Sequence, residues 1–355
     1  MLPSDKVLSK PGETKVVKTN RGGSVVCVRT EVGRDKIRTV RERIGLLTGH
    51  PNMLPILKDV DHQEGNEVCE IVTSYFPNSV ISLHAYYLNT KSSLIPEILL
   101  KIICFQLLKF LGFCKLKAVK LGKVNPKRLM FCSQELKLHP TIGLLSPFQT
   151  SSDAWQRDDE LAYHSPEQLL KLIDPKCGVL WEGEGYPSDV WSVGVLLCRL
   201  NSMSAASGVT TGDLADRYMT ILNDLGVDKL WNQDDLLILQ DWQSKLAKIK
   251  VSPMCTKLLA KLIETCGNTK QTSHATNSYK HLASCCLRIK PESRIQPIQG
   301  MLHTYFDVLT CEKEVVINGT DIRPFLMDFT PLEAACYEQE VNLMRKCKKP
   351  TKKVK

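Results

Sequence analysis

Basic side chains gather between residues 120 and 128, near the middle of the chain. Lys123, Lys127 and Arg128 could each contact a phosphate group, because ammonium and guanidinium groups bind phosphate oxygens. A magnesium site needs oxygen ligands, which lysine and arginine side chains lack. The 14 cysteines of the chain include no C-x-x-C pair, a spacing typical of zinc sites. The residues therefore predict no metal centre.

The first third of the chain has patterns typical of β-strands, which would help to position a site. β-branched runs at 14–19 and 24–30, separated by a glycine-containing turn, predict a hairpin. Apolar residues at helical spacing predict a helix over 34–47. Two further strands are expected at 53–57 and 68–75.

Long helical segments follow from Leu94 onward. A small β-rich front before a larger helical body predicts an α+β fold with two lobes. The helices are expected at 94–113, 165–173, 187–200, 212–225, 234–248, 255–267, 276–288 and 296–305, with a turn at 318–319 and a helix at 331–346.

The most apolar segment, 94–113, is a candidate membrane span only at first sight. Glu97, Lys101, Gln106 and Lys109 interrupt it, whereas a span needs about 20 apolar residues with few or no charges. We expect a core helix with a thin polar stripe.

The net charge of +9 is concentrated in a basic tail, residues 345–355, which holds seven Lys or Arg and no acidic residue. The rest of the chain is nearly neutral, which disfavours a nucleic-acid surface on the folded body. The tail is expected to be a solvated, disordered end, with a nuclear signal or a dock for an acidic partner as alternatives. No secretory signal is evident, so the cysteines are expected to be reduced and the protein cytoplasmic.

The stretch 186–197, YPSDVWSVGVLL, resembles the start of the central buried helix of protein kinases. In that family the aspartate, here Asp189, braces the backbone of the catalytic loop, and the tryptophan, here Trp191, packs into the core. Elementary physics agrees, since Ser188 can cap a helix and Asp189 suits its positive end.

Other kinase-like motifs follow in the family's order. The resemblance implies that Glu167 and Arg294 form a buried ion pair in the larger lobe. It also divides the chain into an N-lobe at 1–76 with a short or absent first strand, a helical C-lobe at 77–306, a C-terminal extension at 307–344 and the tail. The matching segments are 50–52, 71–75, 82–88, 162–167, 287–294 and 302–306.

The residues of phosphoryl transfer are changed at each corresponding position. Arg29 stands where the family has its phosphate-binding lysine, and only Gly12 remains of the glycine-rich loop. Lys123 replaces the catalytic aspartate and Arg128 the magnesium-binding asparagine, while Asn125 is a further changed position of the loop. These replacements invert the charge of the site.

The position of the family's second metal-binding aspartate is occupied by Thr141 or, with a shift of one residue, by Pro140. Neither offers a carboxylate. Apolar positions are retained, since Leu121 and Ile142 can still pack between the lobes. Glu42 lies one residue from the expected place of the regulatory-helix glutamate, and we interpret it as a solvated charge.

These changes predict a pseudokinase: a catalytically inactive scaffold or allosteric regulator that contacts proteins, such as an active kinase or another member of a signalling complex. No cofactor is expected. Weak nucleotide binding through Arg29, Thr73 and Tyr75 is one alternative. Another is an unorthodox active kinase, and a minor one is nucleic-acid binding through the tail. An active site would need a carboxylate from Asp153, Asp158 or Asp159.

Three segments are candidate partner surfaces: the tail, residues 144–163 and residues 174–185. The last contains Trp181, and an aromatic side chain on a loop can anchor a partner. Packing of Trp181 beneath its own loop is the alternative that we favour.

Overall fold

The structure, a computed structural model, describes residues 6–7, 15–19, 25–60, 68–74, 78–122, 124–132, 134–140, 158–181, 186–203, 211–268 and 274–346. It is a mixed α+β protein in which helices predominate. The expected α+β class is thereby confirmed. None of the described helices is long and apolar enough to cross a membrane.

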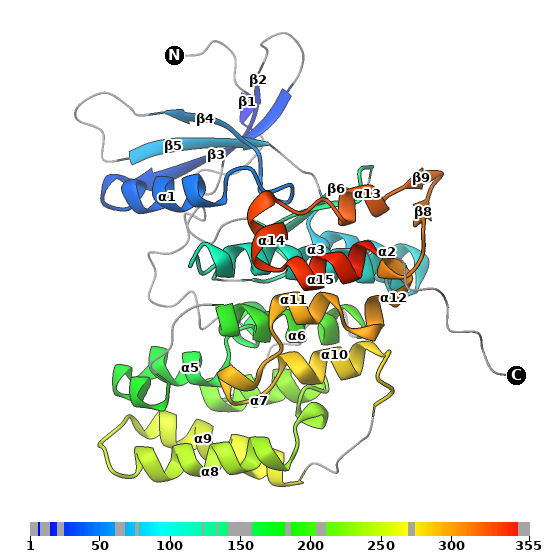
Figure 1. Ribbon diagram of the computed structural model, residues 1–355. Helices are drawn as coiled ribbons and strands as arrows, with labels where there is room; N and C mark the ends of the chain where they lie inside the picture. Colours follow the sequence, from blue (N-terminus) through cyan, green and yellow to red (C-terminus); the bar gives the residue numbers. More distant parts are fainter. Residues whose placement is uncertain are drawn as a thin grey trace, which may run out of the picture.

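A five-stranded antiparallel sheet lies at one end of the molecule (Figure 1). Its order is β1-β2-β3-β5-β4. The strands are β1 (Lys6–Val7), β2 (Lys15–Thr19), β3 (Val25–Gly33), β4 (Ile56–Val60) and β5 (Val68–Ser74), and helix α1 (Arg34–Leu47) follows β3 directly. Ile37, Val40 and Leu47 of α1 are buried, as the helical spacing of apolar residues predicts.

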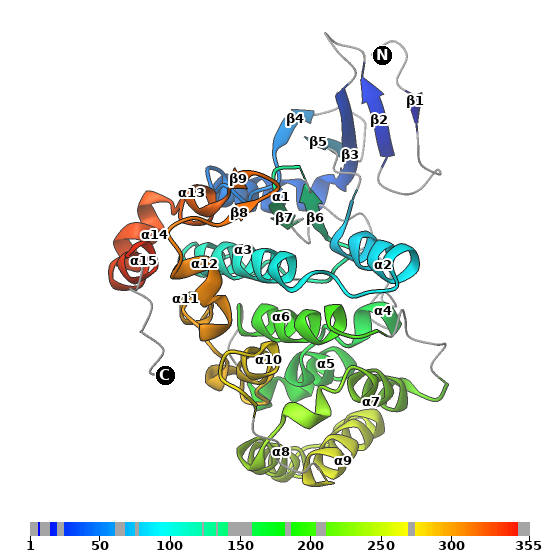
Figure 2. The same ribbon diagram turned by 90° about the vertical axis from the view of Figure 1, so that its right-hand side faces the viewer.

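The helical body is built around α3 (Glu97–Leu116) and α6 (Tyr186–Leu200), which pack against each other. Figures 1 and 2 show α8 and α9 at the end of the body farthest from the sheet. The body also contains α2 (Val80–Lys91), α4 (Asp158–Leu161), α5 (Pro166–Ile173), η4 (Pro175–Leu180), α7 (Leu214–Asp224), η5 (Asp228–Leu230), α8 (Gln233–Leu246), α9 (Pro253–Asn268), α10 (Tyr279–Cys286), η6 (Pro291–Ser293), α11 (Pro297–Met301) and η7 (Thr304–Phe306).

The chain after η7 returns along α3, beside α11 (Figure 2). This C-terminal segment contains α12 (Asp307–Thr310), β8 (Val316–Ile317), β9 (Thr320–Asp321), α13 (Arg323–Leu326), α14 (Pro331–Cys336) and α15 (Glu338–Arg345). Asn318 and Gly319 connect β8 and β9 with φ angles of 50° and 79°, which is the conformation of a tight hairpin turn. The turn predicted at 318–319 is thus confirmed.

Several sequence-based boundaries differ from the structure, among them those of α3, which spans 97–116 instead of 94–113, and three of the differences have a clear local cause. Strand β4 begins at Ile56 instead of residue 53, because the Met53 amide donates to the carbonyl of His50 and closes a turn there. Helix α11 ends at Met301 instead of residue 305, because His303 is extended and caps η7. The helix expected at 331–346 is broken at Tyr337, where ψ is 38°.

The hairpin of β6 (Leu129–Cys132) and β7 (Lys137–Pro140) was not predicted from the sequence. Its strands have four residues each, too few for alternation to stand out. The hairpin follows the 120–128 loop, and therefore fixes where that loop ends.

Candidate functional site

A cavity of about 350 Å³ opens where the 120–125 loop meets the start of α6. Arg43 and Lys120 contribute positive charge to its lining, and Glu160 and Asp189 contribute negative charge. Tyr163 and Gln168 add hydrogen-bonding groups from the turn before α5 and from α5 itself. The cavity therefore presents both signs of charge close to the predicted catalytic-loop positions.

Asp189 holds the backbone of the 120–125 loop in place. It is buried in the first turn of α6, and its two carboxylate oxygens accept hydrogen bonds from the backbone N–H groups of Leu121 and Gly122, both at 2.9 Å. Burial raises the pKa of Asp189 to about 6, against the lowering effects of Lys120 and the two N–H groups. The contact that the kinase resemblance implied is present.

The loop itself turns at Gly122, where φ is +61°. A residue with a Cβ atom is strained in this region, so glycine suits the position. Beyond it, the side-chain oxygen of buried Asn125 accepts the N–H of Lys127 at 3.0 Å, and its carbonyl oxygen accepts the N–H of Arg128 at 2.9 Å. Asn125 thus shapes the loop with its oxygen atoms.

Arg128 lies at the end of the loop with its guanidinium largely covered. One of its terminal nitrogens is 3.9 Å from a carboxylate oxygen of Glu160, which comes from α4. Glu160 is itself buried. The positive charge that replaces a metal-binding group in the kinase comparison is therefore partly balanced by a carboxylate that also lines the cavity.

Glu167 and Arg294 form the predicted ion pair. The two guanidinium nitrogens Nη1 and Nη2 donate to the two carboxylate oxygens at 2.8 and 2.7 Å, and both side chains are at most 2% exposed. Arg294 also donates to the carbonyl oxygens of Pro187, Arg288 and Ile289. The pair therefore joins α5 to the start of α6 and to the segment around η6.

Trp191 completes this frame. It is fully buried, its indole N–H donates to the carbonyl of Ala162 at 3.2 Å, and the Arg294 guanidinium lies 5.2 Å from the centre of its ring system. The expectation that Trp191 packs into the core is confirmed.

The remaining predicted residues are only partly described. Arg29 lies in β3 opposite Lys15 and Val72, and Thr73 is buried in β5 opposite Val28. Lys123, Thr141 and Tyr75 lie outside the described residues, as do residues 144–157 and the tail from 347 onward. Pro140, the alternative to Thr141, is buried and pairs with Leu129.

Neither the known protein families nor the curated proteins contain a significant match to this chain. The comparison with protein kinases therefore depends on the motifs and on the contacts described above.

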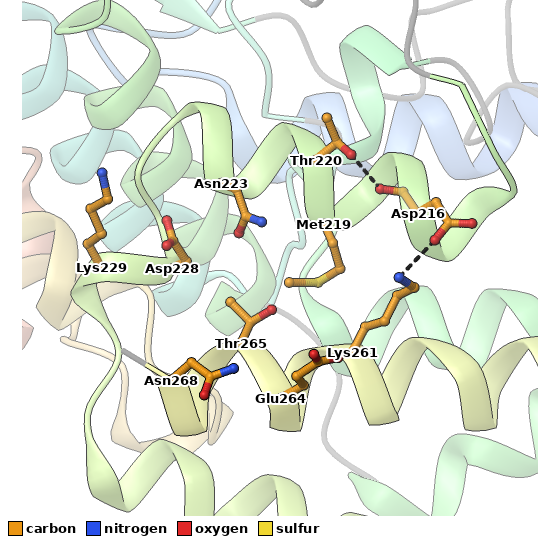
Figure 3. Close-up of a pocket in the computed structure, with 10 residues that line it drawn as sticks. All are labelled: Asp216, Met219, Thr220, Asn223, Asp228, Lys229, Lys261, Glu264, Thr265 and Asn268. Carbon is orange, nitrogen blue, oxygen red and sulfur yellow. Dashed lines mark hydrogen bonds and ion pairs between the residues drawn. The ribbon is translucent and has the colours of Figure 1, made fainter. Parts of the chain in front are cut away.

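A larger cavity, about 650 Å³, lies elsewhere, between α7 and α9 (Figure 3). The carboxylate of Asp216 in its lining is already bound by Lys261 at 2.8 Å and by Lys257, which lies outside the lining. In Figure 3 the polar groups come from α7, α9 and the η5 segment and do not converge on one point. We therefore regard this cavity as a surface groove rather than a reaction site.

One cluster among the described residues brings metal-ligand atoms together. Ligand atoms of His281, Cys285 and His303 lie within 4.8 Å of one another. However, Nδ1 of His303 accepts the N–H of Tyr305, which places the ring proton on Nε2, 2.7 Å from Nδ1 of His281. Metal-bound histidines normally donate from the second nitrogen. The geometry fits a hydrogen-bonded histidine pair better than a metal centre.

The environments of Glu42 and Trp181 can also be compared with the sequence-based interpretations. Glu42 is exposed and pairs with Arg38 at 3.0 Å, so its interpretation as a solvated charge is confirmed. Trp181 follows η4 and is partly buried, which agrees better with packing than with a fully exposed anchor.

Sequence reasoning missed two polar residues of α3. The core position of this helix was predicted correctly, but Gln106 and Lys109 are buried instead of lying on a polar stripe. Gln106 bonds to the backbone of Leu136 and Leu138 in the β7 region. Nothing in the local pattern distinguishes such residues from solvated ones, because their partners lie far away in the sequence.

Proposed function

We propose that the protein is a pseudokinase: a two-lobed, protein-kinase-like molecule that lacks phosphoryl transfer and acts as a scaffold or allosteric regulator. The five-stranded sheet with α1 corresponds to the small lobe of this proposal, and the helical body corresponds to the large lobe. The support comes from the ordered motifs together with the contacts of Asp189, Glu167, Trp191 and Arg294.

The observation that carries the proposal is a braced loop with the wrong charge for catalysis. Asp189 holds the backbone at Leu121 and Gly122, as an active kinase would require. Yet the resemblance assigns Lys123 and Arg128 to the positions of the catalytic and metal-binding groups, and Arg128 faces Glu160. Phosphoryl transfer depends on positioning and on neutralising charge with metal ions, so a loop of this kind retains shape without chemistry.

A retained shape is useful for binding. The bracing contacts restrict the loop and the start of α6, and a preorganised surface loses less conformational entropy when a partner binds. We therefore propose a protein partner, such as an active kinase or another component of a signalling complex. The cavity between α1, the 120–125 loop and α5 is the surface that we assign to the contact.

The proposal predicts that magnesium does not change the effect of ATP on the stability of the protein. Purified full-length protein is titrated with ATP in a thermal-shift assay, with magnesium and with a chelator. A ligand at a hundred times its dissociation constant stabilises the folded state by about 2.7 kcal/mol, so a real site gives a clear shift. A stabilisation by ATP that needs magnesium would contradict the absence of metal ligands, whereas equal curves with and without the metal support the proposal.

A further inference from the structure

The C-terminal segment 307–346 is built into the core of the molecule. Leu326, Phe329, Val341 and Met344 are buried, and α14 packs against α3. Figures 1 and 2 both show α14 and α15 lying alongside α3. The segment is therefore attached to the same helix that packs on α6 and on β7.

Lys109 of α3 is the first anchor of this segment. Its ammonium group is buried and donates to the carbonyl oxygens of Phe325, Leu326 and Asp328, at 3.4, 3.3 and 2.5 Å. It also lies 4.9 Å from the ring centre of Phe329. The carbonyl of Phe325 also accepts the N–H of Asp328, so the ammonium group chiefly supplies a donor to the carbonyls of Leu326 and Asp328, at the end of α13 and just after it.

Glu333 of α14 is the second anchor, and it reaches the turn that follows α1. A carboxylate oxygen of Glu333 lies 3.5 Å from Nε2 of His50, and both side chains are at most 1% exposed. The other oxygen accepts the N–H and the hydroxyl of Thr330, at 2.8 and 2.7 Å. The contact with His50 is longer than a good hydrogen bond, so its attraction is mainly electrostatic.

The orientation of the His50 ring follows from its other nitrogen. Nδ1 accepts the N–H of Asn52 at 3.0 Å, so the ring proton is on Nε2 and faces Glu333. The ring also packs against Phe110 and Phe113, with centroid distances of 5.0 and 4.8 Å. Glu333 is therefore aimed at a fixed proton donor.

The turn His50–Met53 links this contact to the sheet end of the molecule. The amide of buried Asn52 donates to Gln106 of α3 at 2.8 Å and to the carbonyl of Leu138 in β7 at 2.9 Å. Nδ1 of His139 lies 3.3 Å from the carbonyl oxygen of Met53. Helix α1 enters the turn and β4 leaves it, so a shift of the turn moves both elements.

We propose that residues 307–346 form an intramolecular brace that fixes the turn His50–Met53, so that releasing α14 loosens the end of α1. The brace provides a route by which a partner that engages the C-terminal segment changes the relation between the sheet and the helical body. By thermodynamic reciprocity, a partner bound at α1 also changes the attachment of α14. This inference is independent of whether the protein transfers phosphate.

Hydrogen exchange of the full-length protein tests the brace directly. The wild type is compared with Glu333→Gln, which keeps the shape of the side chain and removes its charge. Glu340→Gln is the matched control, because Glu340 lies on α15 and bonds only to exposed Gln299 among the described contacts. We expect roughly tenfold faster exchange in peptides covering residues 44–56 for Glu333→Gln, and no change in these peptides for Glu340→Gln.

Local loosening alone gives a different result. If exchange in Glu333→Gln accelerates only at 326–341 while residues 44–56 keep the wild-type rate, the brace is wrong. Should Glu333→Gln fail to fold, Thr330→Val serves instead, since it removes the hydroxyl that orients the Glu333 carboxylate and caps the start of α14. Faster exchange at 44–56 in this variant supports the brace, and an unchanged rate there overturns it.

Discussion

Glu167 and Arg294 are 127 residues apart in the chain, yet they meet with two hydrogen bonds in the interior. Neither residue stands out by periodicity or composition. Only the resemblance to protein kinases connected them, because an ion pair between distant residues leaves no local pattern. Lys109 and Glu333 show the limit of such reasoning: neither lies in a kinase-like segment, and their burial became evident only in three dimensions.

Removing one partner of this pair should be costly. Glu167→Gln leaves the guanidinium of Arg294 buried without its counter-charge, and breaking a buried pair costs roughly 3–5 kcal/mol. Glu97→Gln is the control, because Glu97 is two-thirds exposed in its pair with Lys101 and such pairs contribute about 0.5 kcal/mol or less. Unfolding in denaturant measures both, and similar costs for the two variants would contradict a structural role of the buried pair.

The pH dependence of stability should carry the signature of Asp189. Its folded-state pKa of about 6 lies above the ordinary value of 3.8, so the folded state keeps a proton that the unfolded state releases between these pH values. The contribution of Asp189 to the unfolding free energy is therefore greatest below pH 4 and declines as the pH rises through 6.

Asp189→Asn isolates this contribution. The unfolding free energy of the wild type minus that of the variant should fall by roughly 2 kcal/mol between pH 4 and pH 7. Denaturant titrations at several pH values provide the measurement. A difference that stays constant, or that grows with pH, would show that burial does not raise the pKa of this carboxyl group.

Among the secondary-structure elements, strongly periodic segments were predictable and short or interrupted ones were not. Helix α1 has the predicted bounds of 34 and 47, because its apolar residues and flanking signals agree. The β6–β7 hairpin and the break at Tyr337 were missed. The strands of the hairpin are too short to show alternation. Tyr337 makes a tertiary contact, the hydrogen bond between its hydroxyl and the carbonyl of Gly112, which single-sequence patterns do not contain.

The close approach of α6 and α10 gives an element-scale prediction. A Cβ atom at Gly194 would lie 2.5 Å from Cγ of Leu287 and 2.9 Å from Cβ of Cys286. Gly194→Ala should therefore destabilise the fold by about 1–3 kcal/mol through overpacking. Gly267→Ala in α9, where a Cβ atom meets nothing within 4 Å, should be neutral or stabilising by up to about 1 kcal/mol.

The same denaturant titrations compare these two alanine variants. Equal stabilities would mean that α6 and α10 are not in close contact at Gly194. A loss of stability for Gly194→Ala alone would support the helix packing around which the motif at 186–197 is arranged.

At the scale of the whole molecule, the α+β class followed from the order of strand and helix signals. The sequence did not predict that the C-terminal segment packs into the core, since 307–344 was expected only as an extension. Its buried anchors on α3 and on the turn after α1 make it part of the frame. The proposed scaffold therefore includes this segment. Binding of a partner to the segment should change how firmly the sheet is held against the helical body.

The central claim, a kinase-like frame without phosphoryl transfer, is tested most directly by a single-turnover assay. Purified full-length protein is incubated with γ-labelled ATP and with magnesium or manganese, and label on the protein and on a generic protein substrate is counted. The proposal predicts no transfer above the level of Lys123→Met. Transfer of one phosphate or more per molecule, abolished in Lys123→Met and in Asp189→Asn, would contradict it.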